Sequence, residues 1–203
     1  MDKVSLLSRY DRLVRSGDPV DAKLAYNLVQ RCVDDTWAIS RVPKDMTEDQ
    51  RETARQECGD LSMRPGILEP TTQLALVKQA AEAGVHRAYA DLYRNHVLGS
   101  RSMPQGPETD AYLESIRQIA LSTADPFALA EEMGRAQARE DKPAELALFV
   151  ATRAALARDR GEPYDPAKDE ATKTRAAALP EDVAKQAIAK GTQFVALNYR
   201  SHR

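Results

Sequence analysis

The chain has 203 residues, of which 30% are charged and only 5% are aromatic, and its formal net charge is −2. This near-neutral balance argues against a protein that binds duplex nucleic acid, because such proteins are usually distinctly basic. No apolar run approaches the roughly 20 residues of a membrane-spanning helix. The start lacks the long apolar segment of a signal peptide, although a mature form with an added methionine would look the same.

The residue types and their spacing favour helices throughout. A core of alanine, leucine and valine with few aromatic rings suits closely packed helices better than a sheet. No stretch shows the sustained alternation of apolar and polar residues that a strand requires. We therefore predict an all-α fold of about ten helices.

The N-terminal third predicts three helices, of which the last is the most polar. A first helix over 3–16 stops at a Gly-Asp-Pro run, whose aspartate caps and whose proline begins a second helix over about 19–36. Thr47 forms a capping box with Gln50 and starts a third helix that reaches about Cys58. This third helix has few apolar residues and would be weakly held by packing alone.

The two cysteines, Cys32 and Cys58, each fall near the end of a predicted helix beside a long polar connection. They are either two unrelated buried thiols or a disulfide that ties down residues 1–62. The disulfide would stabilise the fold by about 3 kcal/mol and would imply an oxidising compartment. We therefore expect a periplasmic or secreted protein if the disulfide forms, and a cytoplasmic one otherwise.

The middle of the chain predicts a hairpin of two short helices, and five further helices follow it. Residues 74–99 form the hairpin, which turns at Gly84 and whose second helix carries an apolar stripe from Val85 onward. The later helices are marked by proline starts, aspartate caps and apolar stripes. Their expected first turns lie near Tyr112, Pro126, Lys142, Asp169 and Pro180.

Small residues follow a repeat-like pattern in the hairpin over 74–99. The pattern is AAxxGxxxAxxxL and then a closing glycine, at Ala80, Ala81, Gly84, Ala88, Leu92 and Gly99. The glycine would end one helix in a left-handed conformation, and the alanines would let the helices approach closely. Segments 15–28 and 125–134 carry partial versions of the pattern. The pattern resembles the Sel-one-like branch of the tetratricopeptide-type repeats.

This resemblance implies a single helical-repeat domain over 1–203, built from stacked antiparallel helical hairpins. An irregular helical bundle with alanine-rich contacts is the alternative. In the repeat architecture, the first helix of each hairpin lines a concave groove that binds a protein or peptide partner. The candidate partner-binding residues are Lys78, Gln79, Tyr89 and Tyr93.

No pattern of catalytic, metal-binding or cofactor-binding residues stands out. Motifs of serine hydrolases, of nucleotide-binding loops and of zinc proteases are missing from the sequence. His86 and His96, ten positions apart on one predicted helix, would point about 80° apart, which is poor geometry for a shared metal. We therefore expect a non-enzymatic scaffold with no cofactor and no metal.

Two other functions remain open. An all-α hydrolase of cell-wall sugars would need a buried acid with a raised pKa in an apolar cleft, for which Glu114 and Glu131 are formal candidates. An immunity or chaperone-like protein for one secreted partner would share the properties of the scaffold.

Overall fold

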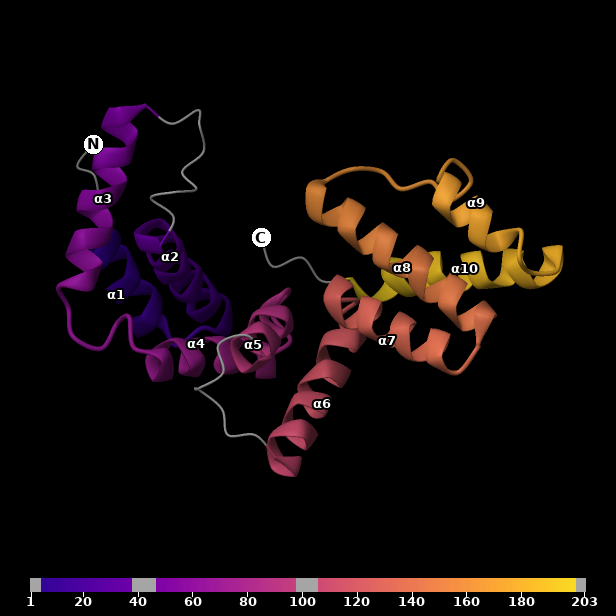
Figure 1. The fold of residues 1–203 in the computed structure, drawn as a ribbon, viewed down its shortest axis with the longest axis horizontal. Coiled ribbons are helices and arrows are strands. Elements are labelled where there is room, and N and C mark those ends of the chain that lie inside the picture. The colour runs from indigo at the N-terminus through magenta and orange to yellow at the C-terminus, as the bar shows by residue number, and fades with distance from the viewer. Residues whose placement is uncertain (1–4, 38–46, 98–105, 200–203) are drawn as a thin grey trace. The chain divides into compact units, whose positions relative to one another are not determined.

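The structure is a computed structural model that describes residues 5–37, 47–97 and 106–199 (Figure 1). Within these ranges the chain forms ten helices and no strand, which confirms the predicted all-α class. None of the helices described there is both long and apolar enough to cross a membrane. The chain divides into two compact units, Met1–Pro104 and Gln105–Arg203, and each is described by itself. The single domain of stacked hairpins stays a prediction.

The first unit contains helices α1 to α5, whose ends follow the local signals of the sequence. Ser5 caps α1 by accepting a hydrogen bond from the Ser8 amide at 3.2 Å, and Gly17 ends it in a left-handed conformation at φ 69°. Asp18 then accepts from the Val20 amide at 2.7 Å at the start of α2. The five helices are α1 Leu6–Ser16, α2 Pro19–Trp37, α3 Glu48–Ser62, α4 Pro70–Glu82 and α5 Ala88–Val97.

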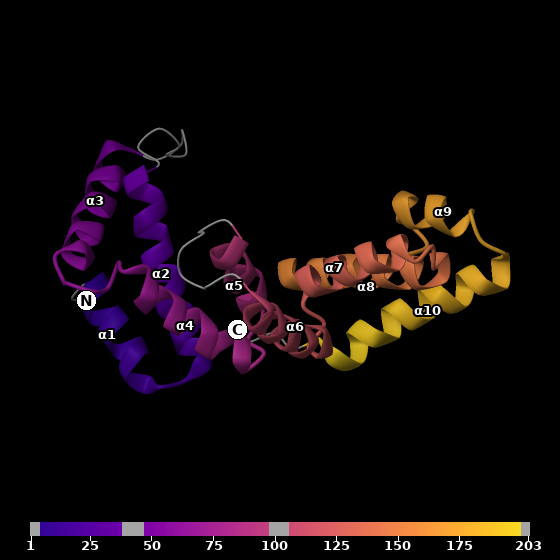
Figure 2. The same ribbon diagram turned by 60° about the horizontal axis from the view of Figure 1, so that its bottom comes forward.

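Helix α2 is the centre of this unit, since it packs against α1, α3 and α4 (Figure 2), while α4 packs against α5. The buried side chains are mostly small or aliphatic, as the composition predicts. They include Ala25, Val29, Leu61, Val77, Ala80, Ala88 and Leu92. The small side chains let the helices lie close together.

A buried ion pair also joins α2 to α5. The Lys23 side chain, in a residue only 8% exposed, donates to Asn27 at 2.6 Å and forms an ion pair with Asp91. Beside it, Asn95 donates to the Tyr26 hydroxyl at 2.7 Å. A buried charge that loses its partner is strongly destabilising, so these contacts favour one pairing of the two helices.

The turn between α4 and α5 confirms one part of the hairpin prediction and corrects another. Gly84 has φ 69°, and the amide of Val85 closes the end of α4 on the Ala80 carbonyl at 2.9 Å. The second helix does not begin at Val85, because Arg87 has a positive φ of 62° and the helix starts only at Ala88. His86 therefore lies in the turn, and placing it on one helix with His96 was wrong. The closing Gly99 falls outside the described residues.

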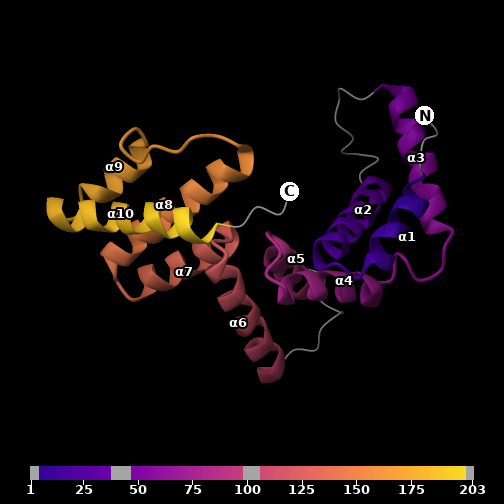
Figure 3. The same ribbon diagram turned by 180° about the vertical axis from the view of Figure 1, so that it is seen from behind.

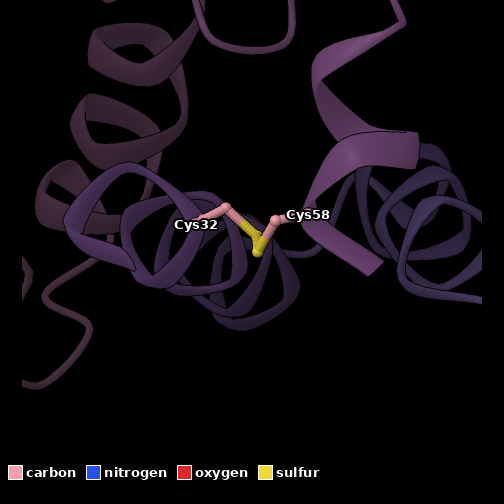
Figure 4. Close-up of a disulfide and its surroundings, with 2 residues drawn as sticks. All are labelled: Cys32 and Cys58. Carbon is pink, nitrogen blue, oxygen red and sulfur yellow. A yellow bond between two sulfur atoms is a disulfide. The ribbon is translucent and has the colours of Figure 1, made fainter. Parts of the chain in front are cut away.

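Cys32 of α2 and Cys58 of α3 are joined through their sulfur atoms, which lie 2.09 Å apart (Figure 4). Their Cα atoms are 5.2 Å apart, within the usual range for a disulfide, and both residues are buried. Of the two alternatives that the sequence leaves open, the structure has the paired cysteines. It attaches the most polar helix of the unit to the helix at its centre.

The second unit contains α6 to α10, and α8 is its central helix. Figures 1 and 3 show from opposite sides how α8 packs against α7, α9 and α10. Asp125 is buried at the start of α7, where it accepts from the amides of Phe127 at 3.0 Å and Ala128 at 3.1 Å. The five helices are α6 Pro107–Ser122, α7 Pro126–Ala138, α8 Lys142–Arg160, α9 Glu170–Ala176 and α10 Glu181–Asn198.

Helices α8 and α10 touch backbone to backbone at Gly191. A Cβ atom at this position would lie 2.2 Å from the carbonyl oxygen of Ala147 and 3.1 Å from the Cβ of Val150. Only glycine leaves room for this contact. The crossing is therefore closer than any pair of residues with side chains would allow.

A polar cluster holds the short helix α9 against α8. Asp169, which precedes α9, accepts hydrogen bonds from Thr172 at 3.0 Å, Tyr164 at 3.1 Å and Arg153 of α8 at 3.2 Å. Burial acts to raise the pKa of Asp169, but these hydrogen bonds outweigh it and lower the pKa below its ordinary value. These side chains hydrogen-bond to one another, and the cluster anchors α9 to α8.

Candidate functional site

A pocket of about 660 Å³ opens in the second unit between α6, α7, α8 and α10. Its floor is apolar and its rim is charged. Apolar side chains and small residues come from all four helices: Leu121, Leu129, Ala144, Ala147, Leu148, Ala151, Gly191 and Phe194. Polar and charged residues complete the lining: Glu114, Arg117, Gln118, Glu132, Arg135, Arg139 and Lys190.

Helical spacing explains how the sequence brings these residues to one place. On α6, Glu114, Arg117 and Leu121 lie three and four positions apart, so they share one face of the helix. Lys190 and Phe194 share a face of α10 for the same reason. Helices α6 and α10 thus each present a polar residue and an apolar residue to the same pocket.

The guanidinium of Arg117 organises the polar side of the pocket. Its side chain is only 3% exposed and makes two hydrogen bonds to Glu114, from Nε at 2.9 Å and from Nη2 at 2.6 Å. Its Nη1 donates to Glu132 of α7 at 2.7 Å. These bonds raise the pKa of Arg117 above its ordinary value, with Glu114 as the largest cause. The buried cation thus holds α6 and α7 together through two carboxylates.

Glu114 is strongly held in its ionised form. It also accepts hydrogen bonds from Gln118 at 2.8 Å and from Arg135 at 2.9 Å. The hydrogen bonds from Arg117, and then from Gln118 and Arg135, lower the pKa of Glu114 well below its ordinary value. A general acid for sugar hydrolysis needs the opposite shift, and the second candidate, Glu131, does not line the pocket.

Three other cationic side chains on the rim have hydrogen-bond donors that the pocket residues do not use. Arg135 makes its one hydrogen bond to Glu114, and Arg139 makes one to Glu132 at 3.2 Å; both side chains are about half exposed. Lys190 makes no ion pair with any of the described residues. Four cations therefore face two carboxylates in the pocket, which leaves an excess of positive charge.

The residues predicted to bind a partner lie in the first unit, on α4 and α5. Gln79 is exposed and donates to the Gly17 carbonyl at 2.8 Å, while Lys78 is half-buried. Tyr89 is only 3% exposed, and its ring centre lies 6.1 Å from that of the half-buried Tyr93. Gln79 and Tyr89 therefore take part in the packing of the unit. Partner binding at the four residues stays a prediction.

In the part of the chain that the structure describes, no group of histidine, cysteine, aspartate and glutamate side chains is arranged to hold a metal ion. Comparisons with protein-family models, with curated proteins and with solved structures found no match to this chain. The resemblance to Sel-one-like repeats stays a prediction.

Proposed function

We propose that the protein is a non-enzymatic helical scaffold that binds a peptide segment of a partner protein in the pocket of the second unit. One observation carries the proposal: a concave site of about 660 Å³ combines an apolar floor with several charged groups at the rim. Specific binding sites commonly have this size and this division of roles, since the apolar surface supplies affinity and the polar groups supply orientation. A binding function was also predicted from the sequence, but for residues of α4 and α5 and not for this pocket of the second unit.

The chemistry of the pocket favours a binding role over sugar hydrolysis. Glu114 is an acceptor saturated by hydrogen bonds, so it has no proton to give at neutral pH. The floor, with the half-buried Leu121, Leu148 and Phe194, offers aliphatic and aromatic surface where a sugar would need partners for its hydroxyls. An apolar side chain of a peptide fits such a floor better.

The cysteine pair supports the proposal that the protein works in a periplasmic or secreted location. Disulfides persist in oxidising compartments and are rare in the cytosol of most organisms. An immunity or chaperone-like role toward one secreted protein would be a special case of the same binding function. A count of free thiols on protein unfolded directly from its native cells tests the location, because two free thiols would contradict it.

Display of random twelve-residue peptides against the immobilised full chain tests the binding function. Ala144→Trp is the blocking variant, because Ala144 lines the pocket and is half-buried. Ala189→Trp is the matched control, since Ala189 is exposed on α10 and does not line the pocket. Circular dichroism checks that both variants fold.

Peptides enriched on the wild-type protein should bind Ala144→Trp at least tenfold more weakly and Ala189→Trp equally well. The tenfold loss corresponds to about 1.4 kcal/mol, which is modest for filling a binding pocket. If no peptide is enriched, or if the enriched peptides bind both variants equally, the proposed function is wrong.

A further inference from the structure

The spare cations of the pocket lie on different helices. Arg135 and Arg139 belong to the α7 side, and Lys190 belongs to α10. Helix α8 packs against both of these helices and contributes four apolar lining residues, Ala144, Ala147, Leu148 and Ala151. The pocket thus has positive charge on the α7 side and on the α10 side, with the apolar surface of α8 completing the floor.

The two carboxylates that line the pocket do not balance its four cations. Glu114 already accepts four hydrogen bonds, three of them from Arg117 and Gln118. A carboxylate has about four lone-pair sites, so Glu114 is fully used. A guanidinium has five N–H donors, and Arg135 and Arg139 each donate one hydrogen bond to a glutamate of the pocket. An occupant with negative charge would meet donors on both sides.

The apolar surface continues beyond the pocket along α10. Leu197 is 75% exposed and lies three positions after Phe194, so the two side chains are neighbours on the helix. Such a continuation suits an extended chain that leaves the pocket more than a small compact molecule.

We infer that the occupant is a peptide with an apolar anchor flanked on both sides by carboxylate side chains. The apolar anchor packs on Leu121, Leu148 and Phe194, and the flanking carboxylates pair with the cations of α7 and with Lys190. This inference rests on the proposed function and adds the chemistry of the partner.

The probes are short peptides with an acetylated start and an amidated end, so that only side chains carry charge. Each has the form Glu-(apolar)-Glu, with two, three or four apolar residues of leucine and phenylalanine between the glutamates. An extended chain rises about 3.3 Å per residue, so this series separates the two glutamates by roughly 10 to 16 Å. The comparison peptides carry glutamine at one end, glutamine at the other end, or lysine at both ends.

Binding to the full chain is measured by isothermal titration calorimetry, which needs no charged dye. We expect at least one of the doubly acidic peptides to bind more than tenfold better than its lysine counterpart, and to bind more weakly in 0.5 M NaCl. Lys190→Gln and Arg139→Gln should each weaken that binding about fivefold. Lys185→Gln, an exposed change on α10 outside the pocket, is the matched control and should have no effect.

The peptides with a single glutamate give the sharpest result. One of them should be sensitive to Lys190→Gln and not to Arg139→Gln, and the other should show the reverse. Acidic peptides that bind no better than the lysine peptides overturn the inference. If display still enriches peptides whose binding is weakened by Ala144→Trp, the proposed function stands and only the inferred charge pattern of the peptide is wrong. If display enriches no peptide, both the function and the inference are wrong.

Discussion

Opening the Cys32–Cys58 disulfide should destabilise the first unit by about 3.5 kcal/mol. The bond closes a loop of 26 residues, and the chain-entropy relation converts this length into that free energy at 25 °C. The structure supports the full value, because α3 is polar and packs only lightly against α1 and α2. Without the bond, Leu61 is the one fully buried side chain among the described residues of α3.

Urea unfolding followed by tryptophan fluorescence measures this effect in the first unit. Trp37 is the only tryptophan of the chain, and α2 ends at it. With an m-value of about 1.5 kcal/mol/M for a unit of this size, the midpoint should fall by roughly 2 M when dithiothreitol is added.

The variant with Cys32→Ala and Cys58→Ala is the control. It should unfold at the reduced midpoint whether or not dithiothreitol is present, which separates loss of the bond from other effects of the reductant. A shift of less than 0.5 M on reduction would refute the reasoning, since it would mean that packing alone fixes α3.

Three further predictions concern the second unit. Gly191→Ala should destabilise it by about 1–3 kcal/mol in a urea titration followed by circular dichroism, because the new Cβ meets a backbone carbonyl. The control Gly134→Ala, exposed on α7 with open space around it, should stabilise the unit by about 0.5–1 kcal/mol. Equal effects of the two variants would contradict the close crossing. Arg117→Met should lower the free energy of unfolding by about 2–3 kcal/mol in the same titration. The loss is smaller than for a fully buried pair, because water reaches the glutamates left behind. An unchanged midpoint would contradict the role of Arg117 in holding α6 and α7 together. The pKa of Glu114 is lowered by folding, so its ion pairs stabilise the protein above its ordinary pKa of 4.5 and this contribution is lost as the pH falls below that value. Between pH 7 and pH 3 the wild type should therefore lose more stability than Glu114→Gln, and an equal loss would contradict the assignment.

The helices could be predicted from the sequence because their ends depend on local chemistry. Proline at the start of α7, aspartate caps and the left-handed Gly17 and Gly84 act within a few residues of each boundary. Two helix starts were misplaced. At α5 the error arose because Arg87 adopts a positive φ that its residue type does not indicate. Helix α6 begins at Pro107 and not near Tyr112, because the proline starts the helix before the apolar stripe does.

The pocket could not be predicted, because its residues meet only through tertiary packing. The pair of Glu114 and Arg117 is visible in the sequence at a spacing of three. Nothing local indicates that Glu132 completes the pair or that Lys190 lies near it. Whether Tyr89 faces the core or a groove could not be decided from the sequence for a related reason, since a tyrosine on a short amphipathic helix can do either.

The contact at Gly191 bears on the peptide binding proposed for the pocket. Because α8 and α10 meet through backbone atoms, the floor and one wall of the pocket are held at a spacing that side-chain rotations do not alter. Under the proposed function the site is preorganised, so that the entropy lost on binding would fall mainly on the incoming peptide. Affinity should accordingly respond most to constraints placed on the partner, such as cyclisation or a proline beside the apolar anchor.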